Sequence, residues 1–479
     1  MKKIALLFFT AFLGLSGVAQ GFELTVKIHN YPEGETVRLG RYYGNQTLYV
    51  PDTAVFDARR GVWVFRRDTP LDGGMYMLVS YQNAPAEFII DQDQRFSIEM
   101  KYPEFGADLK FTGSPENQIF ADFNTKLRPF HQNFGELRRE FDALEDKTSP
   151  KGQELGEKIQ GILTQIEADR LQFMQNNPTH LMTAVFRAQR DIDVPEAPDY
   201  IPENERNQWR YNYWKDNYFG NMDLTDARLL RTPIFYQRLD NYLERVLSPH
   251  HDSIKFGAER LIEQTRGNEE LFRYTLTTIL NKYLQSQIIG YDAIWVYLID
   301  QYYVTGLATW TSEANLENLI NHANKTRPLL IGTVPTEFWC PDLTTVDTPN
   351  ERFRSVFEPR TRYTVVLFWE PNCGHCKTQM PVLRDLYNEK RKELDFEVFA
   401  VCRDNNVETC RNYINTNNMA NWINVSGKAS NIKFDEAWDV TTSPTIYVLD
   451  WKKRIVTKRI NPEQVEPFIR NWNAVHGNE

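Results

Sequence analysis

Two cysteines, Cys373 and Cys376, are separated by two residues and follow closely after an apolar run at 363–369. This pattern predicts a buried strand that delivers both thiols to the start of a helix. Unpaired backbone N–H groups and the helix dipole stabilise an anion there, so we expect Cys373 to be the nucleophile. Cys376, one turn further and more buried, is placed to attack a mixed disulfide formed at Cys373. The spacing therefore predicts a redox-active Cys373–Cys376 disulfide.

Half of a zinc site and an inert structural crosslink are the competing interpretations of this pair. A zinc site needs two more ligands at regular spacing, whereas Cys402 and Cys410 have seven residues between them and no His pair nearby. An inert crosslink that closes so short a loop would stabilise the fold little. Thiol-disulfide exchange is therefore the favoured chemistry, and we expect no metal and no bound cofactor.

The elements that must position the dithiol alternate between strand and helix patterns. Their order predicts an α/β sheet with helices on both faces over residues 327–479. We predict strands at 363–369, 396–401, 443–450 and 454–459, and helices at 377–394, 409–415 and 465–472.

A family resemblance rests on three of these segments. Residues 368–376, Pro381 in the following helix and the Ser-Pro-Thr segment 443–445 resemble thioredoxin-fold thiol-disulfide oxidoreductases. Residues 332–338 resemble the exported, ResA/TlpA-like branch of that family. The resemblance implies a thioredoxin-like α/β domain and thiol-disulfide exchange as its activity.

The resemblance also implies where a substrate binds. In that family the proline that matches Pro444 is cis, and the backbone before it pairs with the substrate chain beside the nucleophile. Ser443 and Pro444 are therefore expected substrate contacts, and we add Trp369 to them. The implied partners are protein or peptide disulfides and an upstream redox donor or acceptor.

Several residues near the dithiol are expected to change the stability of its thiolate and its redox potential. A protonated His375 would stabilise the Cys373 thiolate, and the Gly-His pair between the cysteines resembles that of disulfide isomerases, which implies an oxidising potential. Two positions depart from the family: Leu367 replaces a buried Asp, and Gln379 replaces a Glu. Glu370 is then the nearest acidic group, so we expect His375 and Glu370 to modulate the dithiol.

The other three cysteines also lie in the last third of the chain, and none precedes Cys340. Cys402 follows a predicted buried strand and is interpreted as a packed free thiol. A bond between Cys402 and Cys410 stays open as the alternative, and Cys340 is expected to be unpaired.

The first residues have the pattern of a secretory signal peptide. Two lysines precede an apolar run at 4–15 and small residues up to Ala19, so we expect residues 1–19 to be removed. The apolar run is shorter than the roughly 20 residues that a membrane-spanning helix needs. We therefore expect export to the periplasm or cell envelope, with no stable membrane span after signal removal.

The composition excludes nucleic acid as an expected partner. The chain of 479 residues has a formal net charge of −9 and no basic stripe, whereas phosphate binding needs clustered Lys and Arg. A hydrophobic fraction of 41% is that of an ordinary globular protein, and this length suggests about three domains.

The region before the dithiol divides into two parts. Residues 20–113 alternate apolar and polar residues, which predicts an antiparallel β-sandwich of about seven strands. Residues 114–326 have helical periodicity, which predicts an all-helical domain of about eight helices that begins at Pro115 after a Ser114 cap. Neither part has a metal-spaced His cluster. Both resemble uncharacterised segments that precede thioredoxin-like domains in envelope proteins of the Bacteroidetes.

Two alternatives to thiol-disulfide exchange come from other functional classes. A thiol peroxidase usually has Thr and Pro at fixed offsets before its reactive cysteine, but Cys373 and Trp369 occupy those offsets before Cys376. The second alternative is an envelope binding protein whose thioredoxin-like domain is only structural.

Overall fold

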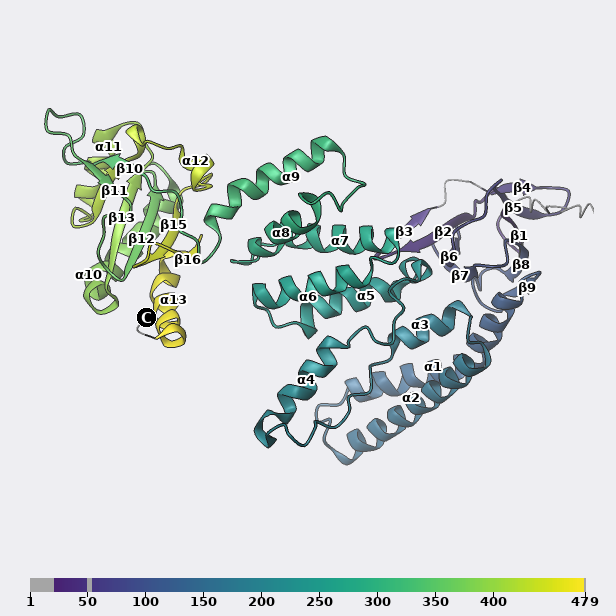
Figure 1. Ribbon diagram of the computed structural model, residues 1–479. Coiled ribbons are helices and arrows are strands. Elements are labelled where there is room, and N and C mark those ends of the chain that lie inside the picture. Colours follow the sequence, from purple (N-terminus) through teal and green to yellow (C-terminus); the bar gives the residue numbers. More distant parts are fainter. Residues whose placement is uncertain (1–20, 50–53, 478–479) are drawn as a thin grey trace, which may run out of the picture. The chain divides into compact units, whose positions relative to one another are not determined.

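The structure is a computed structural model that describes residues 21–49 and 54–477 (Figure 1). The expected signal peptide, 1–19, lies outside these residues. The chain packs into two compact units. One runs to Leu247 and includes Gln264–Phe272, and the other comprises Ser248–Glu263 and the chain from Arg273 onward. The expected helical region 114–326 therefore contributes to both units.

The β-rich part of the first unit has two sheets, of strand order β4-β5-β1-β8-β9 and β3-β2-β6-β7. Buried side chains from both sheets, such as Val26 and Phe88, form one core, as in a sandwich. The expectation of antiparallel pairing is wrong for β1 and β8, which are parallel. The chain between them crosses to the second sheet and back twice, and such crossover connections allow parallel pairing. The strands are β1 (Glu23–His29), β2 (Arg38–Tyr43), β3 (Gln46–Tyr49), β4 (Val55–Asp57), β5 (Val62–Arg66), β6 (Gly74–Val79), β7 (Pro85–Ile90), β8 (Arg95–Lys101) and β9 (Lys110–Thr112).

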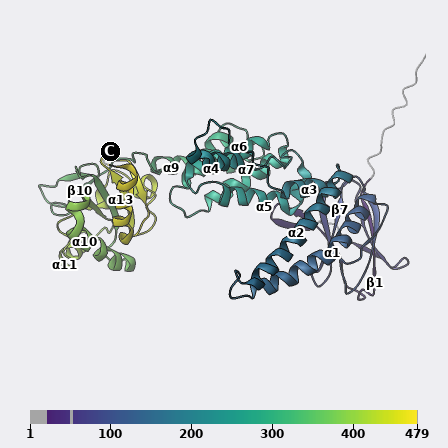
Figure 2. The same cartoon turned by 90° about the horizontal axis from the view of Figure 1, so that it is seen from below.

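The long helices α1 (Pro115–Asp142) and α2 (Pro150–Asn176) lie side by side (Figures 1 and 2). Ser114 caps α1 as predicted, because its hydroxyl accepts from the backbone N–H of Asn117 at 3.4 Å. The buried amide of Asn117 also bonds both the N–H and the C=O of Ile89, at 2.7 Å each, and so fastens α1 to the edge strand β7.

Shorter helices complete the region before residue 330 (Figure 1). Asn177-Pro178 ends α2, and α6 begins two residues after Pro249, because Pro is poorly tolerated inside a helix. The elements are α3 (Leu181–Gln189), η1 (Glu203–Glu205), α4 (Arg206–Asp216), η2 (Ala227–Arg231), α5 (Pro233–Asn241), η3 (Tyr242–Val246), α6 (His251–Gln264), α7 (Glu269–Leu284), α8 (Asp292–Leu298), η4 (Ile299–Tyr303), α9 (Glu313–Thr326) and η5 (Arg327–Leu329).

The last part of the second unit is a five-stranded sheet of order β14-β13-β12-β15-β16. Strands β12, β13 and β14 are parallel, and β15 and β16 are antiparallel to their neighbours. The predicted α/β fold is confirmed, but the short strand β14 was not predicted. The elements are β10 (Trp339–Pro341), β11 (Phe353–Ser355), β12 (Tyr363–Trp369), α10 (Gly374–Leu394), β13 (Phe396–Cys402), α11 (Val407–Thr416), β14 (Ile423–Ser426), η6 (Gly427–Ala429), α12 (Phe434–Ala437), β15 (Thr445–Asp450), β16 (Ile455–Lys458) and α13 (Pro462–His476).

Two apolar cores sandwich the central strand β12, whose seven residues are all buried. Val365, Leu367 and Trp369 share one core with residues of α10, α11 and α13. Val366 and Phe368 share the other core with residues of α12 and of the β10 segment. Successive residues of a strand point to opposite faces, so β12 is held from both sides and its end is a rigid base for the dithiol.

Candidate functional site

The dithiol lies where β12 gives way to α10. Cys373 is the N-cap residue of α10, and its Sγ accepts from the backbone N–H of Cys376 at 3.4 Å. The sulfur therefore sits at the unpaired N–H groups of the first helical turn. Both cysteines are free thiols, and Cys373 is partly exposed whereas Cys376 is buried. The site thus pairs an accessible sulfur with an inaccessible one.

Burial raises the pKa of Cys376 to about 12. A hydrogen bond from the Glu370 backbone acts in the opposite direction, while the neighbouring Cys373 and the Glu370 carboxylate raise the pKa further. Cys376 is therefore a neutral thiol near pH 7. It can attack a disulfide only when its proton leaves.

Ser443 and Pro444 lie beside the nucleophilic sulfur. The thiol of Cys373 donates to the backbone carbonyl of Ser443 at 3.1 Å. The Ser443–Pro444 peptide bond is cis, as the resemblance implied. Both residues are partly exposed, so this segment borders Cys373 on a face that a substrate chain can reach.

Glu370 and Arg403 meet at the side chain of Ser443. The Ser443 hydroxyl donates to Glu370 Oε1 at 3.1 Å, and Arg403 Nη1 donates to the same hydroxyl at 3.3 Å. Arg403 Nη1 also lies 3.6 Å from Glu370 Oε1. The Glu370 carboxylate is thus held beside the dithiol by a serine and a guanidinium.

Sequence reasoning did not identify Arg403. It directly follows Cys402, the last residue of β13, and Cys402 pairs with Trp369, the last residue of β12. Because the carboxyl ends of neighbouring parallel strands meet at one sheet edge, the residue after β13 belongs near the residues after β12. That rule is the signal that would have found Arg403.

The prediction that Trp369 contacts substrate is wrong for its side chain. Trp369 is fully buried in the core between the sheet and the helices α10, α11 and α13. Its ring packs 5.1 Å from that of Tyr413 on α11, and Tyr413 in turn lies against the same core beside Cys373. Burial raises the pKa of Tyr413, the thiolate forms of Cys376 and Cys373 would raise it further, and Arg384 lowers it. Trp369 therefore belongs to the core on which Cys373 and Cys376 pack.

The remaining predicted neighbours occupy different surroundings. His375 is exposed at the start of α10, next to both thiols in the chain. Leu367 is buried in the core under the dithiol, so that core position carries no carboxylate. Gln379 is partly exposed on α10. The nearest acid to the thiols along this segment is therefore Glu370, which is engaged with Ser443.

The other three cysteines are all buried. Cys402 and Cys410 form a disulfide, so the interpretation of Cys402 as a free thiol is wrong. The strand end and the first turns of α11 bring their Cα atoms to 6.3 Å, which is within the usual range for a disulfide. Cys340 is free, and burial raises its pKa to about 12.

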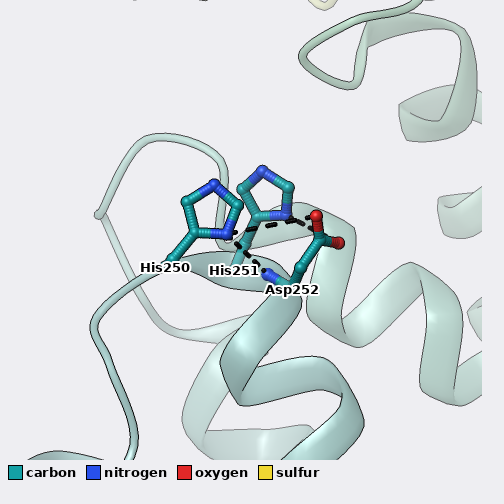
Figure 3. A group of neighbouring side chains, drawn as sticks. All are labelled: His250, His251 and Asp252. Carbon is teal, nitrogen blue, oxygen red and sulfur yellow. Dashed lines mark hydrogen bonds and ion pairs between the residues drawn. The ribbon is translucent and has the colours of Figure 1, made fainter. Parts of the chain in front are cut away.

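A cluster of metal-ligand types that the sequence analysis missed lies at the start of α6. His250, His251 and Asp252 place one ligand atom each within 4.8 Å of one another, and Figure 3 shows both rings beside the carboxylate. However, the ammonium of Lys255 already bonds Asp252 Oδ1 at 2.7 Å, and the first turn of a helix is itself positive. Both effects oppose a bound cation. The adjacent His-His-Asp residues would have been the sequence signal.

Family comparison identifies two regions of the chain. Residues 361–456 match the model of a thioredoxin-like family, and the sheet order around β12 agrees with this match. This part of the chain is therefore a thioredoxin-like domain. Residues 154–327 match a domain of unknown function. No curated protein matches the chain. In the part of the chain that the structure describes, no helix is long and apolar enough to span a membrane.

Several solved structures are similar to parts of this chain. A domain of a possible thiol-disulfide isomerase from Cytophaga hutchinsonii is 27% identical, with a TM-score of 0.29, and the match covers 32% of this chain and 99% of that one. A thioredoxin-like protein from Bacteroides caccae is 17% identical, with a TM-score of 0.43 and coverage of 59% and 99%. The thioredoxin domain of a thiol-disulfide oxidoreductase from Bacteroides vulgatus is 23% identical, with a TM-score of 0.25 and coverage of 29% and 97%.

Proposed function

We propose that this protein is an exported thiol-disulfide oxidoreductase that exchanges disulfides with protein or peptide substrates in the cell envelope. The observation that carries the proposal is the pairing of a partly exposed Cys373, 3.1 Å from the Ser443 carbonyl, with a buried Cys376 one turn further along α10. A nucleophile at a helix start with a resolving thiol behind it is the arrangement that exchange requires. The thioredoxin-like domain supports the same reaction.

In the reducing direction, the Cys373 thiolate attacks one sulfur of a substrate disulfide. A bond forms between Cys373 and that sulfur, and the other substrate sulfur leaves as a thiolate. Cys376 then loses its proton and attacks the Cys373 sulfur, so the Cys373–Cys376 disulfide forms and the second substrate thiolate leaves. Two electrons have passed to the substrate. A thiol donor in the envelope restores the dithiol, and the same steps in reverse oxidise a substrate.

The groups around Cys373 have separate tasks in this scheme. The Ser443 carbonyl orients the thiol of Cys373, and Glu370 and Arg403 fix the Ser443 side chain. The partly exposed segment at Ser443 and Pro444 is where an extended substrate would lie. Exposed His375 is free to meet the substrate or the solvent, and when protonated it favours the thiolate.

Insulin reduction in the presence of dithiothreitol tests the reaction. We expect Cys373→Ala to lower the rate to background, because the attacking sulfur is lost. Cys340→Ala is the matched control, because it removes a free but buried thiol and should keep at least half of the rate. Unchanged activity in Cys373→Ala would refute the proposal.

The midpoint potential of the Cys373/Cys376 pair separates an exchange enzyme from a binding protein with an inert crosslink. An exchange pair should titrate in glutathione or dithiothreitol buffers between about −120 and −270 mV. A structural disulfide would lie below about −300 mV. Export is supported by the signal-peptide pattern at 1–19, and it is tested by N-terminal sequencing of protein from the envelope fraction, which should begin at Gln20.

A further inference from the structure

A cavity of about 540 Å³ opens in the first unit, between the β1–β2 loop and the β4–β5 hairpin. Three aromatic side chains contribute to its wall: Tyr31, Phe56 and Trp63. The ring of Trp63 lies 5.2 Å from that of Tyr31, edge to face, and 4.8 Å from that of Phe56. Phe56 is 52% exposed, so aromatic surface remains open to a ligand. The face of an aromatic ring attracts cations, and Trp does so best.

Two carboxylates, of Glu33 and Glu35, line the same cavity. Glu33 is exposed and Glu35 is partly buried. Among residues 21–49 and 54–477, neither side chain has an ion pair or a hydrogen bond. Burial raises the pKa of Tyr31, and the Glu35 charge adds to this rise, so the carboxylate lies close to the aromatic wall. A partly buried carboxylate beside aromatic rings is stabilised when a cation enters.

Arg38 is the basic residue of the cavity lining, and its charge opposes the rise in the pKa of Tyr31, so its guanidinium also lies close to the aromatic wall. Arg38 Nη2 donates to Asn83 Oδ1 at 2.8 Å. The guanidinium carbon also lies 4.7 Å from the centre of the Tyr49 ring. Neither Asn83 nor Tyr49 lines the cavity. Both partners are neutral, so Arg38 keeps its positive charge, and two glutamates against one arginine leave a net negative charge at this opening.

The strand next to the cavity has an open edge. β4 is the outermost strand of its sheet, and β5 is its only partner within the described residues. Val55 of β4 is 70% exposed and is followed directly by Phe56 of the cavity wall. An extended polypeptide can add to such an edge through backbone hydrogen bonds and place alternate side chains into a neighbouring pocket.

We propose that this aromatic cavity binds the Lys or Arg side chain of an extended polypeptide segment that pairs with β4. The rings of Phe56 and Trp63 hold the apolar stem and the cation, and Glu33 and Glu35 neutralise its charge. The site is a binding surface for a basic segment of a partner protein. It does not depend on the dithiol reaction, so either proposal can fail alone.

Fluorescence anisotropy of labelled peptides tests this site in the intact mature protein. One probe is an acetylated pentapeptide of Thr and Val with a central Lys, and the matched probe has norleucine in place of Lys. We expect the Lys peptide to bind at least tenfold tighter, because only it supplies the charge. Equal affinities, or no binding of the Lys peptide at millimolar concentration, would overturn the proposal.

Two variants locate the binding. Glu35→Gln keeps the shape of the cavity and should weaken the Lys peptide about tenfold while leaving the norleucine peptide unchanged. Glu104→Gln, at an exposed Glu outside the cavity, should change neither. If Glu35→Gln has no effect, the cavity is not the site. Competition by spermidine that matches the unlabelled Lys peptide would overturn the polypeptide part of the proposal, since it would show that a free cation suffices.

Discussion

The two cysteine pairs of the thioredoxin-like domain lie at the same edge of one sheet, yet they differ in access. Cys402 ends β13 beside Trp369, which ends β12 four residues before Cys373. Cys402 and Cys410 are fully buried and bonded. Cys373 is partly exposed, and its sulfur lies at a helix start beside the carbonyl of Ser443. The Cys402–Cys410 bond joins the end of β13 to α11, whereas Cys373 and Cys376 both lie in the first turn of α10. Both pairs are therefore found where a strand gives way to the next helix, and that location alone does not distinguish them.

The exposure of Cys373 and the position of its sulfur at a helix start therefore separate the reactive pair from the structural one. A substrate disulfide must reach the attacking sulfur in line, and among the five cysteines, which all lie in the described part of the chain, only Cys373 is partly exposed. Arg403 connects the two pairs, because it follows Cys402 in the chain and bonds Ser443 beside Cys373. Changes at each pair should consequently have very different effects on exchange.

The largest effect is expected for Cys376→Ser. Without the resolving thiol, the mixed disulfide at Cys373 cannot be released intramolecularly, so insulin turnover should fall at least about 100-fold. Mass spectrometry under non-reducing conditions should show substrate attached to Cys373. The matched variant Cys410→Ser should trap no substrate at Cys402, because Cys402 is fully buried. Substrate trapped at Cys402 instead would break the distinction between the two pairs.

The second prediction concerns pH. Burial raises the pKa of Cys376 to about 12, so its reactive thiolate fraction rises about tenfold for each pH unit between 6 and 9. Resolution of a mixed disulfide should accelerate in the same proportion, without a plateau. The measurement is stopped-flow release of thionitrobenzoate from Cys373 loaded with that group. A plateau below pH 8 would contradict this prediction, because it would show that Cys376 loses its proton at a much lower pH, either through a lower pKa or through a nearby base.

Long periodic segments made most of the fold predictable from the sequence. The strand at 363–369 is β12 with the same bounds, because a run in which only Thr364 is polar leaves few alternatives. The four-residue strand β14 was missed because so short a segment carries little pattern. Trp369 was predicted to contact substrate, although it ends the predicted buried strand and shares the face of Val365 and Leu367. The alternation of side chains along a strand already places Trp369 on that buried face.

Contacts between distant segments could not be read from the sequence in the same way. The Arg403 contact with Ser443 joins the end of β13 to the loop before β15. The Cys402–Cys410 bond depends on the angle at which α11 leaves the sheet edge, which no local pattern encodes. The sequence therefore named the dithiol, Ser443 and Glu370, but not the hydrogen bonds through which Glu370 and Arg403 meet at the Ser443 hydroxyl.

A smaller effect is expected for Arg403→Met. The variant removes the guanidinium that bonds Ser443 and balances the Glu370 carboxylate, so the uncompensated charge beside the dithiol should disfavour the Cys373 thiolate. Because both side chains are partly exposed, we expect only a three- to tenfold loss in kcat/KM, about 0.7–1.4 kcal/mol. The rate of Cys373 alkylation by iodoacetamide at pH 7 should fall in parallel.

Two further variants make the Arg403 effect specific. Glu370→Gln combined with Arg403→Met should recover part of the alkylation rate, since no unbalanced charge remains. Arg470→Met removes an exposed arginine of the same domain that pairs with Glu466 and Glu393, away from the dithiol, and should leave the rate unchanged. An equal loss in Arg470→Met would assign the effect to the stability of the domain.

The smallest effect on exchange is expected when the structural pair is removed. Replacing Cys402 and Cys410 by Ala opens a short loop and should lower the free energy of unfolding by about 2–3 kcal/mol. Urea unfolding measures that loss, with Cys340→Ala as a control that removes a buried thiol without breaking a bond. Insulin reduction at 25 °C should stay within twofold, because the bonded pair is buried and Arg403 keeps its place just after β13. A tenfold loss in a variant that is still folded by circular dichroism would mean that the bonded pair supports exchange after all, either by holding Arg403 at Ser443 or by disulfide exchange with Cys373 and Cys376.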